Sequence, residues 1–111
     1  MSKRAAEPSS GNVFADLGLP NADERMAKAK LALRICEIIE ARGISQTRAA
    51  KLLGVDRSKV SALMRGKIEG FSTERLFRFL NALGRDVEIV IRPKPKKAKK
   101  AQMRVLAPSE A

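Results

Sequence analysis

The sequence predicts a mainly α fold, a small bundle of four to five helices followed by one C-terminal β-strand. Apolar residues recur at helical spacing in four stretches of the 111-residue chain, and a glycine follows the end of each stretch. One late segment instead alternates apolar and polar residues. A chain of this length fits one core. We divide it into an N-terminal arm (1–20), a helical domain with the strand (21–92) and a basic, disordered tail (93–111).

The first helix is expected to begin after Asn21 and to end at Arg42. Asn21, with Glu24 three residues later, resembles a capping box, and Gly43 stops the helix. Its apolar residues cover a wider arc than one core requires. We expect burial on two sides, against the next two helices and against either a subunit partner or the arm; burial in one core alone is the alternative. The arm is expected to pack on the chain's own core or on a partner because it carries Val13, Phe14, Leu17 and Leu19.

Residues 46–66 contain two short helices that are joined at Gly54. Ser45 supplies a hydroxyl to cap the first helix, and Gly54 suits the left-handed conformation that ends it. Asp56 is the expected cap of the second helix, and Gly66 ends it. The residues that pack this pair together are Ala50, Gly54, Val60, Leu63 and Met64.

The net charge of +11 is concentrated in two regions. Residues 42–67 hold seven basic residues and one acidic residue, and residues 93–111 hold six basic residues and one acidic residue. Positive charge gathered on a helix pair is typical of proteins that bind polyanions. A solvated basic face is the alternative for the first region. The proline-rich and lysine-rich tail is either a solvated end or a non-specific arm that binds phosphates.

The helix pair resembles the helix-turn-helix of the phage-repressor (Cro/cI, or XRE) family. The resemblance rests on a small residue at Ala50, glycine at Gly54 and a β-branched residue at Val60. The accompanying apolar positions are Ala49, Leu53, Val55 and Leu63. In that family the second helix enters the major groove of DNA.

The wider arrangement, from residue 12 to residue 92, resembles the XRE-type antitoxins of the HigA kind. This resemblance implies a helix-turn-helix bundle that binds a palindromic operator in double-stranded DNA as a homodimer and represses its own operon. The alternative function is an antitoxin that binds and neutralises a small RelE/HigB-like toxin protein.

The resemblance also implies roles for individual residues. The residues expected to face the bases are Arg57, Ser58, Ser61 and Ala62. Arginine can form a bidentate pair with guanine, serine reads bases loosely, and alanine can contact a thymine methyl group. The residues expected to contact phosphates are Gln46, Lys59, Arg65 and Lys67. Phosphate contacts set the register of the protein on DNA, not its sequence preference.

A fourth helix is expected between Ser72, a natural N-cap, and Gly84. Its phenylalanines are expected to lie in the core, with a base-stacking platform as the alternative. The strand covers residues 86–92, in which Val87, Ile89 and Ile91 alternate with more polar residues. A lone strand needs a partner. We expect the same strand of a second subunit, and the segment 12–15 or a sheet edge of another protein are the alternatives.

Several classes of protein are not expected. The chain has no histidine and one cysteine, Cys36, which leaves a zinc site or histidine-based catalysis without ligands or a base. Cys36 is expected to fill the core. We therefore expect neither an enzyme nor a cofactor. The sequence contains no apolar run long enough to span a membrane and no apolar signal-peptide segment, so a cytoplasmic protein is expected.

Overall fold

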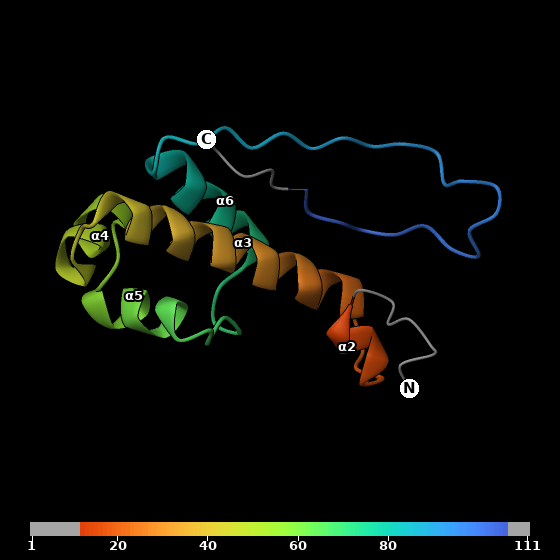
Figure 1. Ribbon diagram of the computed structural model, residues 1–111, viewed down its shortest axis with the longest axis horizontal. Helices are drawn as coiled ribbons and strands as arrows, with labels where there is room; N and C mark the ends of the chain where they lie inside the picture. Colours follow the sequence, from red (N-terminus) through yellow and green to blue (C-terminus); the bar gives the residue numbers. More distant parts are fainter. Residues whose placement is uncertain (1–11, 107–111) are drawn as a thin grey trace.

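The computed structural model describes residues 12–106, which contain five helices and no strand. The helices are α2 (Val13–Asp16), α3 (Ala22–Arg42), α4 (Gln46–Leu53), α5 (Arg57–Met64) and α6 (Thr73–Ala82). The long helix α3 runs through the molecule; α5 and α6 pack against it, α4 packs on α5 and α6, and α2 lies against the N-terminal end of α3 (Figure 1). The mainly helical fold class is therefore confirmed for the described residues.

Helix α3 forms one wall of the core. Its buried face contains Ala27, Leu31, Ala32, Ile35, Ile38 and Ile39. Opposite this face lie α5 and α6, which contribute the fully buried side chains Val60, Leu63 and Leu76. Burying a side chain of this size contributes about 1.5–3 kcal/mol. The extra apolar width of α3 is not buried throughout, since Leu33 remains 59% exposed.

The predicted capping box at the start of α3 is wrong. Asn21 has φ 54° and ψ 41°, and its side chain makes no capping hydrogen bond. An N-cap residue normally adopts extended backbone angles so that its side chain reaches the next N–H groups. The chain turns sharply between α2 and α3, and asparagine tolerates the left-handed conformation that this turn requires. Gly43 ends α3 with φ 64°, as predicted.

Asparagine does cap a helix one element earlier. The side-chain oxygen of Asn12 accepts hydrogen bonds from Phe14 N (2.9 Å) and Ala15 N (3.1 Å) at the start of α2. Its amide nitrogen donates to Ala22 O at 3.0 Å. The arm thus packs on the chain's own α3, one of the two surfaces expected for it.

The remaining caps follow the sequence signals. The Ser72 hydroxyl accepts a hydrogen bond from Arg75 N (3.1 Å) at the start of α6. Gly84 follows the end of α6 with φ 81°. Phe71 and Phe79 are buried and their rings meet edge to face, with centroids 5.9 Å apart, which confirms that they belong to the core.

The predicted strand over residues 86–92 is wrong for the described chain. These residues leave α6 in irregular structure, and no strand is present between residues 12 and 106. Ile89 and Ile91 are 72% and 91% exposed, whereas Val87 packs on the core. A strand needs a neighbour to accept its backbone hydrogen bonds. The intramolecular alternative, pairing with residues 12–15, is excluded because Val13–Asp16 forms the helix α2.

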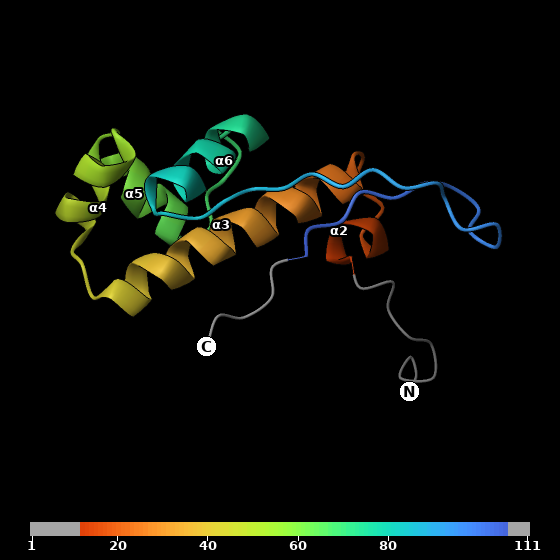
Figure 2. The same cartoon turned by 90° about the horizontal axis from the view of Figure 1, so that it is seen from above.

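Beyond residue 92 the chain turns and comes back. Figure 2 shows the segment passing along α3, turning beyond its N-terminal end and returning toward α2. The returning part is held by a hydrogen bond from Met103 N to the Asp23 carboxylate (3.2 Å), and Val105 packs against the core.

Candidate nucleic-acid interface

The helix pair α4 and α5 is formed by local signals. The Ser45 hydroxyl accepts a hydrogen bond from Arg48 N (3.1 Å), which caps α4. Gly54 has φ 71° and ends α4, and Val55 N then donates to Ala50 O at 3.0 Å. Asp56 occupies the N-cap position of α5, but its side chain makes no capping hydrogen bond. The positions and ends of α4 and α5 were therefore predictable from the sequence. The capping hydrogen bond expected from the Asp56 side chain is absent.

Helix α5 is fixed to the bundle along one side only. Val60 and Leu63 are each 1% exposed, and Met64 is half-buried against the core. Ala50 is buried in the adjacent helix. The Cys36 thiol of α3 donates to Leu63 O at 3.5 Å, which ties the last turn of α5 to α3. One face of α5 is therefore set by packing, and the other is left accessible.

The residues expected to read bases lie on the accessible side of α5 to different degrees. Arg57 and Ser58, in the first turn, are exposed. Ser61 and Ala62, in the second turn, are half-buried. The N-terminal turn therefore presents the most accessible donors.

The residues expected to contact phosphates surround α5. Lys59, Arg65 and Lys67 are exposed, and Gln46, the first residue of α4, is half-buried. The Lys59 ammonium lies 6.0 Å from the centroid of the Phe71 ring. This cation–π contact holds a charge beside α5.

Arg75 lies beside the same aromatic ring as Lys59, and the sequence did not identify it as a candidate site residue. Its guanidinium lies 5.6 Å from the ring centroids of both Phe71 and Phe79. Lys59 and Arg75 thus approach one aromatic ring from α5 and α6. The sequence did contain one indication of the contact between Arg75 and Phe79: the two residues are four positions apart and therefore lie on the same face of α6.

Among the described residues, no carboxylate forms an ion pair with the cations of this region. The cations on or next to α4 and α5 are Arg48, Lys51, Arg57, Lys59, Arg65 and Lys67. The ion pairs seen within residues 12–106 lie elsewhere: Arg34 pairs with Glu37 on α3, and Arg78 pairs with Glu74 on α6. Exposed cations that pair with no carboxylate in residues 12–106 remain available to phosphates.

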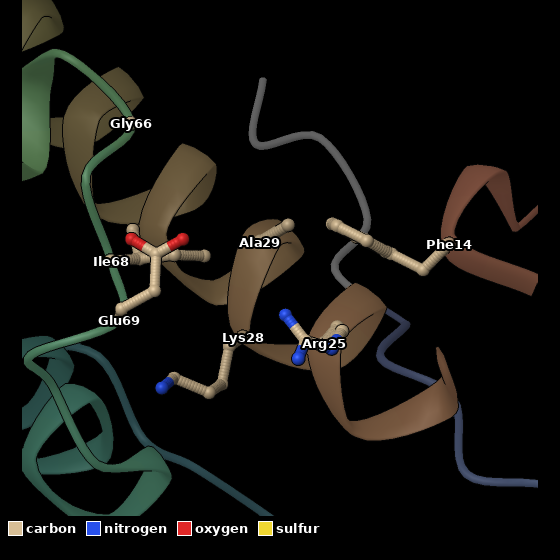
Figure 3. Close-up of a pocket in the computed structure, with 7 residues that line it drawn as sticks. All are labelled: Phe14, Arg25, Lys28, Ala29, Gly66, Ile68 and Glu69. Atoms are coloured by element: carbon tan, nitrogen blue, oxygen red, sulfur yellow. The ribbon is translucent and has the colours of Figure 1, made fainter. Parts of the chain in front are cut away.

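A hollow of about 190 Å³ lies at the other end of the bundle, between α2, α3 and the loop after α5. It is lined by Phe14, Arg25, Lys28, Ala29, Gly66, Ile68 and Glu69. Figure 3 shows Phe14 on one side, Ile68 and Glu69 on the other, and the α3 residues between them. Arg25 is already engaged, because its Nε donates to Pro20 O at 3.0 Å. This mixture of groups does not converge on one ligand atom, and the exposed side of α5 remains the candidate site.

In the described part of the chain, no group of three His, Cys, Asp or Glu side chains could hold a metal ion. Cys36 is half-buried and packs on the core, as predicted. Burial raises the pKa of its thiol, and the negative charge of Glu40 adds to this effect. No helix between residues 12 and 106 has the length and apolar character that crossing a membrane requires.

The comparisons with known proteins agree with this geometry. A family model described as a helix-turn-helix domain matches residues 13–92. A solved structure described as an XRE family transcriptional regulator is 49% identical and superposes with a TM-score of 0.75. The match covers 79% of this chain and 99% of that one. No curated protein matches the chain. The chain belongs to the XRE family of helix-turn-helix transcriptional regulators.

Proposed function

We propose that the protein is a sequence-specific regulator that binds a palindromic operator as a homodimer and represses its own operon. The observation that carries this proposal is the state of α5. Its inner face is buried through Val60 and Leu63, while its first turn presents Arg57 to solvent. A rigidly held helix with an exposed polar face is what the major groove admits.

Base recognition is assigned to Arg57, Ser58, Ser61 and Ala62. Arg57 is the main specificity contact, because a bidentate arginine–guanine pair discriminates by about 1–3 kcal/mol. Ser58 and Ser61 add weaker hydrogen bonds, and Ala62 contacts a thymine methyl group. The lower exposure of Ser61 and Ala62 agrees with a helix that enters the groove by its N-terminal turn.

Phosphate contacts are assigned to Gln46, Lys59, Arg65 and Lys67. To these we add Arg75, because it shares the Phe71 ring with Lys59. Lys59 and Arg75, held beside one aromatic ring, would both contact phosphates of the DNA backbone next to α5. They would contribute affinity and register without sequence preference.

We assign the contact between the two subunits of the homodimer to the exposed segment 86–92. In the single chain this segment has irregular structure, and the apolar residues Ile89 and Ile91 are exposed to solvent. Pairing with the same segment of a second copy would satisfy its backbone groups and cover this surface. Ile89 and Ile91, which the single chain leaves exposed, would then form the contact between the two segments, while Val87 anchors each segment to its own core. Two-fold symmetry would set the two α5 helices about one DNA turn, ~34 Å, apart.

The test of the proposal is a footprint on the DNA immediately upstream of the gene. The expected result is a protected palindrome whose half-site centres are about 10 base pairs apart. A single protected half-site would rule out the dimer, and no protection at low salt would rule out the proposal altogether.

A second candidate function is neutralisation of a RelE/HigB-like toxin. It is favoured by the arm, where Val13 and Leu17 remain exposed although α2 packs on α3. Exposed apolar residues on a small helix are suited to a protein partner. Co-expression with an adjacent small reading frame tests it: a stable complex that Leu17→Glu abolishes would support this function.

A further inference from the structure

The C-terminal segment carries a second concentration of positive charge, separate from α5. Residues 92–104, here named the basic loop, contain no acidic residue and seven basic ones. They are Arg92, Lys94, Lys96, Lys97, Lys99, Lys100 and Arg104. The segment has no aromatic residue, so it offers no platform on which unpaired bases could stack.

The basic loop lies between two places where the chain contacts the body of the protein. Val87 precedes it and Val105 follows it, and both pack against the core. On the returning side, Met103 N donates to Asp23 Oδ2 at 3.2 Å. The other oxygen, Asp23 Oδ1, accepts from Asn12 Nδ2 at 3.4 Å. One carboxylate at the start of α3 therefore joins the arm and the returning tail.

The tip of the basic loop is closed by a local turn. Ala98 N donates to Pro95 O at 3.0 Å, and Lys94 Nζ donates to Ala98 O at 2.8 Å. Lys94 is thus occupied in shaping the turn. Lys96 and Lys97, which lie within it, are exposed, and no carboxylate among residues 12–106 is paired with either.

This arrangement lowers the cost of binding. A free lysine-rich tail loses chain entropy when it is ordered on a ligand, whereas a loop that is already closed loses less. Several exposed cations gathered on one short loop suit the repeated phosphates of a nucleic-acid backbone.

The basic loop and α5 are too far apart to bind the same phosphates. Figure 1 shows the tip and the helices α4 and α5 toward opposite ends of the longest axis, which extends 45 Å. Figure 2 shows the same separation from a second direction. Any DNA contact made by the basic loop must therefore lie outside the footprint of α5.

We propose that the basic loop is a second, sequence-independent site for duplex DNA, which binds phosphates beyond the segment read by α5. This inference rests on the proposed DNA-binding function. Binding of cations to DNA releases counterions, and each phosphate contact adds about 0.9 to the slope of log K against log salt concentration. The basic loop should therefore be visible in the salt dependence of binding.

The experiment compares two double variants of the full chain. K96Q/K97Q changes the loop tip, and K28Q/K30Q changes two lysines of α3; each lowers the formal net charge from +11 to +9. The probe is the upstream DNA, extended by about two helical turns on each side of the protected region. Binding is measured by fluorescence anisotropy over a series of salt concentrations.

The expected result is a salt slope that is less steep by up to about 1.8 in K96Q/K97Q, with a clearly smaller change in K28Q/K30Q. Equal slopes in the two variants would overturn the inference, because net charge alone would then explain the effect. An unchanged slope in K96Q/K97Q would overturn it as well. If the wild-type protein binds no DNA, the proposed function fails, and that outcome is distinct from both.

Discussion

The guanidinium of Arg42 donates a hydrogen bond to the backbone carbonyl of Leu83. This contact joins the last residue of α3 to the residue that caps the end of α6. Arg85 Nη1 reaches the same carbonyl at 3.2 Å. Cations at the C-terminal end of a helix complement its dipole and its unpaired carbonyl groups. Arg42 was counted from the sequence with the basic residues around α4 and α5, but the structure gives it a role in the bundle.

Arg42→Ala is expected to lower the free energy of unfolding by about 1–2 kcal/mol, because the hydrogen bond from an exposed arginine to Leu83 O is lost. DNA affinity of the folded protein should change little. Urea unfolding and anisotropy measure the two quantities. A variant with normal stability and weak DNA binding would show that Arg42 contacts DNA instead.

Arg57→Ala is expected to lower discrimination between the operator and random DNA by about 1–3 kcal/mol, because the bidentate base contact is lost. Lys59→Ala provides the matched comparison, since a phosphate contact should weaken binding to both DNAs alike. Competition binding with the two duplexes measures the effect. Equal losses on both duplexes for Arg57→Ala would contradict its role in reading bases.

Gly54→Ala is expected to destabilise the protein by about 1–2 kcal/mol. The cost is in the backbone, because φ is 71° and a Cβ atom would meet no other atom within 4 Å. Gly70→Ala is the control: its Cβ would also meet nothing within 4 Å, but its φ is not in the left-handed region. That variant should be neutral or slightly stabilised. Similar unfolding free energies for the two variants would refute the explanation.

Ile91→Glu is expected to reduce the mass of the protein in solution from dimer to monomer. The side chain is 91% exposed in the single chain, so the substitution should not unfold it. Leu33→Glu is a control, because Leu33 is also exposed but lies on α3. Light scattering at a fixed concentration measures the mass. A dimer that survives Ile91→Glu would place the subunit contact elsewhere.

Cys36 should make stability depend on alkaline pH. Burial raises the pKa of the folded thiol above its ordinary value of 9.0. As the pH rises through that value, the unfolded chain ionises first, which favours unfolding. The contribution of the buried thiol to stability is therefore fully present below the pKa of Cys36 in the unfolded chain. It is lost as the pH rises through the higher pKa of Cys36 in the folded protein. Unfolding free energies of wild type and Cys36→Ala between neutral and alkaline pH should converge; a constant difference would contradict this reasoning.

Local signals in the sequence predicted local structure well. Ser45 and Ser72 cap helices, and Gly43, Gly54 and Gly84 follow helix ends, because each depends only on neighbouring backbone groups. The helical core could be predicted for the same reason, since its periodicity is contained in single helices.

Features that depend on distant residues could not be predicted in this way. The capping role expected of Asn21 failed because the turn after α2 forces its backbone into the left-handed region. The strand at residues 86–92 failed because a strand exists only with a partner, and alternation cannot show whether one is present. The cluster of Lys59, Phe71 and Arg75 brings together α5 and α6, so the approach of Lys59 to the Phe71 ring depends on how these helices pack.

The unbroken course of α3 has a consequence for everything attached to it. Asp23, near its start, holds the arm and the returning tail, while Ile39, near its end, is buried in the core with α5. The two positions are separated by ~24 Å of helix axis at 1.5 Å per residue. The helix thus fixes both the distance and the angle between the two regions. One residue inserted between them would rotate the basic loop by about 100° about the helix axis relative to α5.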